Sequence, residues 1–149
     1  MNRFTDAQHR ERLCKAARKV FADRGILVAY AFGSRIGGNP RPDSDLDIGY
    51  YLINDSTRQV LSLKDEMILV AALSAELGVE VDLHNLGSAP LELRGRVLEE
   101  GVRIFSGDDV LRVGLERTIL STYHDYKEVF EHMHEIRLRR KASAGAAHG

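Results

Sequence analysis

The sequence has little cysteine and almost no excess of charge. Cys14 is the only cysteine among 149 residues, so no internal disulfide can form and no thiolate zinc site is available. The 21 basic residues nearly balance the 22 acidic ones, which gives no indication of a general nucleic-acid-binding surface. No apolar run approaches the length of a membrane span, and the first residues lack an apolar signal segment. We therefore expect a cytoplasmic protein that does not bind membranes.

Two common nucleotide-binding motifs are also missing. The segment 33–38 is rich in glycine and superficially similar to a phosphate loop, but no Lys-Ser or Lys-Thr pair follows it. The chain contains no Gly-x-Gly-x-x-Gly sequence either. P-loop and Rossmann proteins are therefore excluded.

A glycine and a serine directly follow an apolar, strand-forming run over residues 26–32. Gly33 has no Cβ and allows a sharp turn, after which Ser34 can begin a short helix. Free amides at the helix start and the Ser34 hydroxyl would then point to one spot that favours an anion. We predict that Gly33 and Ser34 bind a triphosphate and that Arg35 contacts it, whereas Arg41 could equally be a solvated loop charge.

Three carboxylates are candidate metal ligands. The side-chain alternation of a strand over residues 46–52 places Asp45 and Asp47 on one face, with apolar residues on the other. Asp82 has a comparable position in a later alternating strand over residues 79–85. Mg²⁺ is usually held by one or two carboxylates together with substrate phosphates. We predict catalytic and metal-binding roles for all three.

Simpler explanations exist for the residues around these acids. The Asp-Ser-Asp-Leu-Asp run could be a solvated turn, but a turn needs neither the Gly-Ser pair nor carboxylates on a strand with an apolar opposite face. Asp43 follows Pro42 and fits a turn residue better than a ligand. His84 shares the face of Asp82, where a role in the site is conceivable and an exposed or hydrogen-bonded histidine is the more ordinary interpretation.

The order of these patterns predicts an α/β fold of the two-layer α+β kind, with helices packed on a small mixed β-sheet. The strands are expected over 26–32, 46–52, 79–85 and 102–105, and the helices over 5–24, 54–77, 90–100 and 108 to about 140. The long last helix closes a single domain over residues 1–140, followed by a disordered tail over 141–149. The order of the strands stays open.

Together, Gly33-Ser34, ten residues, Asp45-x-Asp47 and a later strand with Asp82 resemble the signature of the DNA polymerase beta-like nucleotidyltransferase superfamily. The short chain resembles the minimal nucleotidyltransferase (MNT) branch. This resemblance implies a nucleotidyltransferase fold, ATP as substrate and two Mg²⁺ ions held by the three acids. Many members of the branch resemble antitoxins of type VII-like pairs with HEPN-domain toxins, which are small helical ribonucleases. That further resemblance implies transfer of AMP to a tyrosine hydroxyl of the toxin.

Three functions remain open at this point. The leading one is a protein adenylyltransferase that acts as an antitoxin. The second is adenylylation of a small molecule of the aminoglycoside type, for which a further helical domain or a dimer would have to form the acceptor pocket. The third is an antitoxin that neutralises its partner by binding alone, although masking a partner requires no metal site. The sequence identifies neither the acceptor hydroxyl nor the base of the nucleotide.

Overall fold

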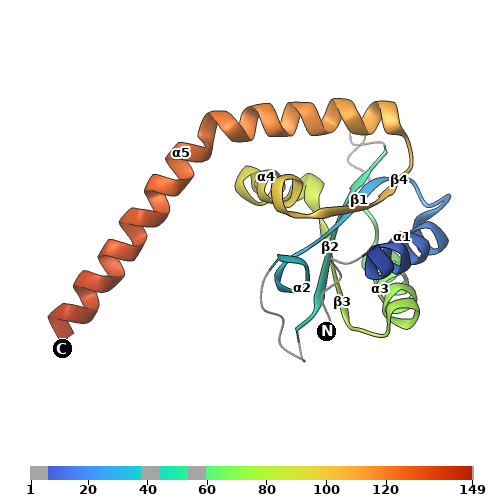
Figure 1. Ribbon diagram of the computed structural model, residues 1–149, viewed down its shortest axis with the longest axis horizontal. Coiled ribbons are helices and arrows are strands. Elements are labelled where there is room, and N and C mark those ends of the chain that lie inside the picture. The colour runs from blue at the N-terminus through green and yellow to red at the C-terminus, as the bar shows by residue number, and fades with distance from the viewer. Residues whose placement is uncertain (1–6, 38–43, 54–59, 149) are drawn as a thin grey trace.

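Four strands form one mixed sheet at the centre of the protein (Figure 1). The computed structural model describes residues 7–37, 44–53 and 60–148. The strands are β1 (Ile26–Phe32), β2 (Leu46–Leu52), β3 (Val81–Asn85) and β4 (Val102–Ser106). They lie in the order β3-β2-β1-β4. β1 pairs antiparallel with both β2 and β4, whereas β2 and β3 are parallel, so the small mixed sheet is confirmed.

Helices cover both faces of this sheet, which gives one layer more than the two that the sequence predicted. α1 (Ala7–Phe21) and α3 (Leu63–Leu77) pack on one face, where Leu46, Ile48 and Tyr50 of β2 enter the larger hydrophobic core. α4 (Leu91–Glu100) and α5 (Asp109–His148) lie on the other face, over a smaller core. The short helices α2 (Ser34–Gly37) and η2 (Leu86–Ser88) follow β1 and β3. Because β2 and β3 are parallel, the chain must cross over between them, and α3 makes that crossover.

The ends of α3 follow from its capping residues. The Ser62 hydroxyl accepts a hydrogen bond from the backbone N–H of Asp65, and Gly78 ends the helix with a φ of 69°. The sequence predicted that this helix begins at residue 54, which is wrong, because α3 begins at Leu63. Residues 54–59 lie outside the described part of the chain. The start predicted for the first helix, residue 5, also lies outside the described part.

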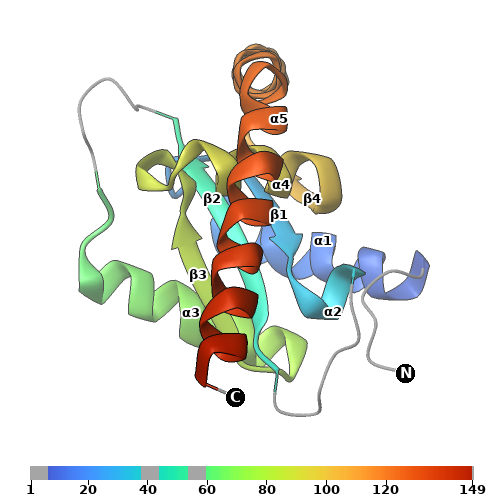
Figure 2. The same ribbon diagram turned by 90° about the vertical axis from the view of Figure 1, so that its left-hand side faces the viewer.

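The last helix is longer than expected. α5 continues to His148, beyond the end predicted at about Arg140, and the alanines of residues 142–147 are strong helix formers. Ile119 and Tyr123 in its first half are buried, whereas Tyr126, Met133 and Leu138 are exposed. Figure 1 shows the second half extending away from the domain, and Figure 2 views it from that side, where it runs in front of the sheet. A domain boundary near residue 140 stays a prediction.

A polar network fastens the first half of α5 to the sheet. The Tyr30 hydroxyl of β1 donates a hydrogen bond of 2.6 Å to Glu116, which also accepts one of 2.6 Å from Arg112. Burial and the bond to Glu116 raise the pKa of Tyr30, so this hydroxyl keeps its proton.

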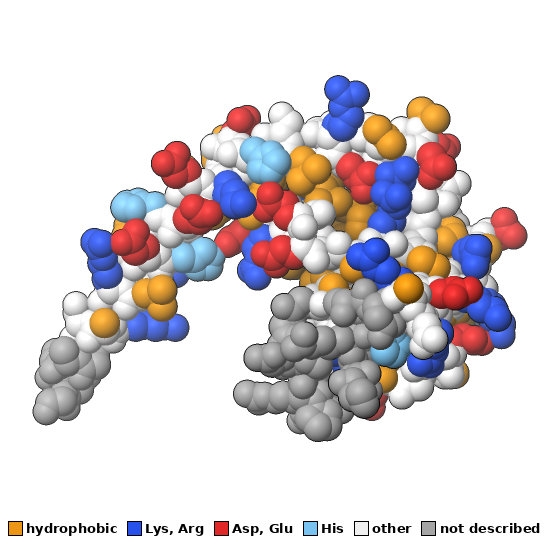
Figure 3. Space-filling model, in the orientation of Figure 1, with side chains coloured by type: hydrophobic (Ala, Val, Ile, Leu, Met, Phe, Trp, Pro, Cys, Tyr) orange, Lys and Arg blue, Asp and Glu red, His pale blue; other side chains and the backbone are white. Residues whose placement is uncertain are grey.

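Acidic and basic side chains alternate along α5 in the face shown in Figure 3. Of the helices that the structure describes, none combines the length and the apolar character needed to cross a membrane.

Gly95 allows α4 to lie directly against α5. A Cβ added at Gly95 would collide with the ring of Tyr123, which is 4% exposed. We therefore expect Gly95→Ala to lower the free energy of unfolding by about 1–3 kcal/mol, the usual cost of overpacking. Urea denaturation followed by circular dichroism measures this change.

Gly114→Ala is the matched control, because Gly114 also lies in a helix but a Cβ there meets no atom within 4 Å. Alanine is favoured over glycine in a helix, so this variant should gain up to about 1 kcal/mol. Equal changes in the two variants would contradict the role given to the Gly95–Tyr123 contact.

Candidate active site

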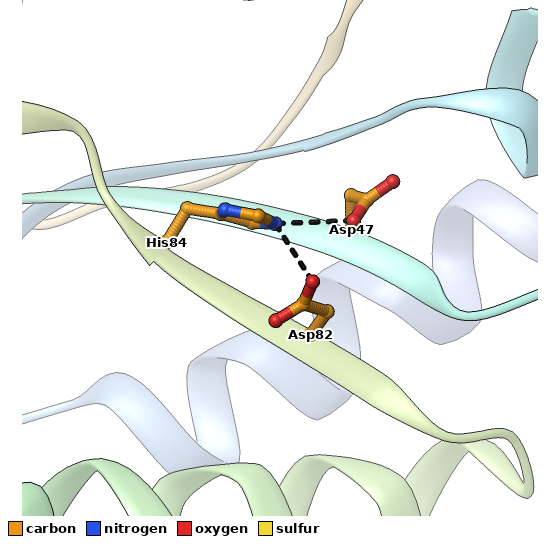
Figure 4. A group of neighbouring side chains, drawn as sticks. All are labelled: Asp47, Asp82 and His84. Atoms are coloured by element: carbon orange, nitrogen blue, oxygen red, sulfur yellow. Dashed lines mark hydrogen bonds and ion pairs between the residues drawn. The ribbon is translucent and has the colours of Figure 1, made fainter. Parts of the chain in front are cut away.

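The site is built on the parallel pair of strands β2 and β3. Their register places Asp47 beside Asp82 and Gly49 beside His84. Side chains alternate along a strand, so Asp82 and His84 share a face of β3. Leu46 and Ile48 enter the core under α1 and α3, and Asp47 therefore points to the opposite face of the sheet. These three polar side chains meet there (Figure 4).

The imidazole of His84 lies between the two carboxylates. Its Nε2 atom is 3.1 Å from Asp47 Oδ1 and 3.3 Å from Asp82 Oδ2 (Figure 4). The hydrogen bond to Asp47 raises the pKa of His84, the charges of Asp82 and Asp47 raise it further, and burial opposes them. Among the described residues, these three side chains are the group whose potential ligand atoms all lie within 4.8 Å of one another. The group can therefore hold a cation.

Gly33 lies directly against the Asp47 carboxylate. Gly33 has a φ of 90°, in the region that favours glycine, and a Cβ there would collide with Asp47 Oδ2. The register of β1 with β2 places Phe32 beside Asp47, which brings the turn after β1 next to the carboxylates. The predicted phosphate turn and the predicted metal ligands are thus neighbours in space.

A cavity of about 520 Å³ opens beside this turn. Its volume is in the range of small-molecule sites, about 300–1,000 Å³. One wall is formed by Phe32, Gly33 and Ser34, and the other wall is formed by α4. The α4 residues are Leu93, Arg96, Val97 and Glu100. Sequence analysis missed this wall, because the spacing of Leu93 and Val97 indicates an apolar helix face without indicating what lies opposite it.

The other predicted site residues have different surroundings. Arg35 is 4% exposed, and its Nε donates a hydrogen bond to the Ser44 carbonyl, so it supports the backbone just before Asp45. A contact between Arg35 and a nucleotide phosphate stays a prediction. Asp45 is exposed and lies outside the group formed by Asp47, Asp82 and His84. Arg41 and Asp43 fall outside the described residues.

The mixed sheet carries two carboxylates beside a glycine-serine turn and a cavity, and these residue types could hold a metal ion and a phosphate. Residues 15–110, more than half of the chain, match the family described as Polymerase beta, Nucleotidyltransferase. The protein belongs to this nucleotidyltransferase family. The matched region includes the Gly33-Ser34 turn and all three predicted acids. A comparison with curated proteins found no match.

Solved structures of toxin–antitoxin complexes share the fold. A mutant of the MntA–HpeT toxin–antitoxin is similar with a TM-score of 0.61 and 20% identity, covering 86% of this chain and 98% of that chain. A toxin–antitoxin with AMP-PNP has a TM-score of 0.60 and 22% identity, with the same coverage. A tri-AMPylated Shewanella oneidensis HEPN toxin in complex with MNT antitoxin has a TM-score of 0.55 and 21% identity, covering 86% and 95%. These three structures thus come from toxin–antitoxin complexes, and at 20–22% identity the likeness shows a shared fold.

Proposed function

We propose that this protein is the antitoxin of a HEPN/MNT toxin–antitoxin pair and silences its HEPN ribonuclease toxin by Mg²⁺-dependent AMP transfer. The donor is ATP, the acceptor is a tyrosine hydroxyl of the toxin and the second product is pyrophosphate. The observation that carries this proposal is the register that brings Asp47 and Asp82 together beside the Gly33-Ser34 turn. The AMP-PNP complex and the AMPylated toxin among the similar structures support ATP as donor and a HEPN toxin as acceptor.

The donor atoms at the site fit the metal that this function requires. Asp47 and Asp82 offer carboxylate oxygens within 4.8 Å of each other, the ligand type that Mg²⁺ prefers. Asp45 directly precedes β2, where strand alternation would place it on the face of Asp47, and it would contribute to a second ion. Bound Mg²⁺ would neutralise phosphate charge and lower the pKa of the acceptor hydroxyl.

The chain's own residues would position the two reactants. Gly33 and Ser34 line the cavity, where their backbone amides and the Ser34 hydroxyl would bind the triphosphate. Arg96 brings a positive charge to the same cavity from α4, and Arg35 supports the backbone before Asp45. The toxin's oxygen would then form its bond to the α-phosphorus as the bond to pyrophosphate breaks, so catalysis is mainly positioning and electrostatics.

The test uses the purified protein, Mg²⁺ and a HEPN-domain protein, to be sought first among the reading frames next to the gene for this protein. ATP labelled at the α-phosphate should transfer its label to the toxin, and mass spectrometry should locate AMP on tyrosine. ATP labelled at the γ-phosphate should leave the toxin unlabelled. Failure of α-label transfer in the presence of Mg²⁺ would overturn the proposal.

The same assay separates the alternatives. AMP on an aminoglycoside, with none on the toxin, would identify a small-molecule adenylyltransferase. Undiminished toxin neutralisation by an Asp47→Asn protein would identify an antitoxin that acts by binding alone.

A further inference from the structure

His84 is the member of the side-chain cluster that the proposed AMP transfer does not use. Strand β3 fixes its backbone beside Gly49, and its ring lies 5.3 Å from the ring of Phe32, measured between centroids. The side chain is 33% exposed, so the ring is held by neighbours and remains open to a ligand. Figure 4 shows its Nε2 edge directed at the space between Asp47 and Asp82.

The spacing of the His84 Nε2 atom from each carboxylate oxygen matches that of neighbouring ligands in a coordination shell. Adjacent ligands in an octahedron around an ion at about 2.1 Å lie roughly 3 Å apart. The Nε2 atom is 3.1 Å from Asp47 Oδ1 and 3.3 Å from Asp82 Oδ2. Each carboxylate oxygen therefore lies at about the distance from this nitrogen that separates two neighbouring ligands of one ion. A neutral imidazole with its proton on Nδ1 presents the Nε2 lone pair to the same point.

We propose that His84 is a nitrogen ligand of the ion held by Asp47 and Asp82, and that this ligand shifts the preference of the site from Mg²⁺ toward Mn²⁺. Mg²⁺ selects oxygen ligands, whereas imidazole binds first-row transition metals more readily. Mn²⁺ also accepts carboxylates and octahedral geometry, so it suits a set of two carboxylates and one imidazole. This inference rests on the proposed function, because it concerns the metal of the same site.

The test measures metal binding by the full chain without nucleotide. Mn²⁺ affinity follows from the electron paramagnetic resonance signal of the free ion, and Mg²⁺ affinity follows from calorimetry. We expect His84→Asn to raise the Kd for Mn²⁺ by about tenfold or more and to change the Kd for Mg²⁺ by less than about twofold.

His124→Asn is the matched control. His124 is exposed on α5, and its Nε2 lies 3.0 Å from a carboxylate oxygen of Glu99, so this variant removes a similar ring–carboxylate contact away from the site. It should bind both metals as the original protein does. Circular dichroism of each variant shows that the fold is retained.

A spectroscopic measurement distinguishes a ligand from a residue that only orients the carboxylates. Pulsed electron paramagnetic resonance of the Mn²⁺-loaded protein, made with isotopically labelled histidine, should show a directly bonded nitrogen that disappears in His84→Asn. A Mn²⁺ complex without nitrogen coupling, or an equal loss of affinity for both metals, would overturn the inference.

The outcomes for His84 and for the proposed function are separable. Nitrogen coupling in a protein that transfers no AMP would overturn the function and leave the ligand in place. Mg²⁺-dependent AMP transfer by a protein without nitrogen coupling would overturn only the role of His84.

Discussion

Replacing Asp47 with asparagine is expected to lower the rate of AMP transfer by about a thousandfold. Asp47 is in register with Asp82 and its Oδ1 atom is 3.1 Å from His84 Nε2, so it belongs to the donor group. A catalytic metal contributes several kcal/mol to transition-state stabilisation, and each increment of about 1.4 kcal/mol is a factor of ten in rate. Asparagine has the shape of aspartate but lacks its charge. Single-turnover transfer from ATP labelled at the α-phosphate measures the effect.

Glu11→Gln is the control for this charge removal. Glu11 is exposed on α1, on the face of the sheet opposite the site, and its replacement also converts an acid to its amide. Its transfer rate should equal that of the original protein. An Asp47→Asn protein that retains a third or more of the rate would contradict the role given to this carboxylate.

Gly33→Ala is expected to lower AMP transfer by about a hundredfold without removing any donor atom. The new Cβ would collide with Asp47 Oδ2 and displace the carboxylate, and a displacement of about 1 Å at a reacting centre can cost this factor. The φ of 90° adds backbone strain to the clash. Transfer rate and melting temperature should be measured on the same preparation.

The control variant Gly25→Ala distinguishes the effect of backbone strain from the effect of displacing the Asp47 carboxylate. Gly25 precedes the opposite end of β1 and has a φ of 74°, but a Cβ there meets no atom within 4 Å. This variant should lose about 1–2 kcal/mol of stability and keep its transfer rate. Equal losses of rate in the two glycine variants would show that backbone strain, rather than the position of Asp47, controls activity.

The sequence allowed the local part of this site to be predicted. Strand alternation indicated that Asp82 and His84 share a face, because a period of two depends only on neighbouring residues. The contact of His84 with Asp47 depends on the parallel pairing of β2 with β3. Which strands pair is decided by packing of the whole sheet, so no local pattern contains it. The α4 wall of the cavity was missed for the same reason.

The ends of the helices were also not fully predictable from local sequence patterns. Ser56 and Ser62 are both suitable capping residues for the helix that follows the second strand, and the described structure uses Ser62. Near the other end of the chain, the last helix was predicted to end at about residue 140, yet α5 continues to His148. Composition indicates whether a segment tends to form a helix. Which of two suitable capping residues begins the helix depends on how the helix packs.

The parallel register of β2 and β3 also determines how this protein can lose activity. A shift of β3 by one residue would turn Asp82 toward the core and Leu83 toward the site, and Val81 would leave its buried position. The same error would remove the site and damage the core, so a misaligned chain should fail to fold and be degraded. Folded but inactive forms should therefore arise by substitution of individual side chains, and rarely by insertions or deletions within these two strands.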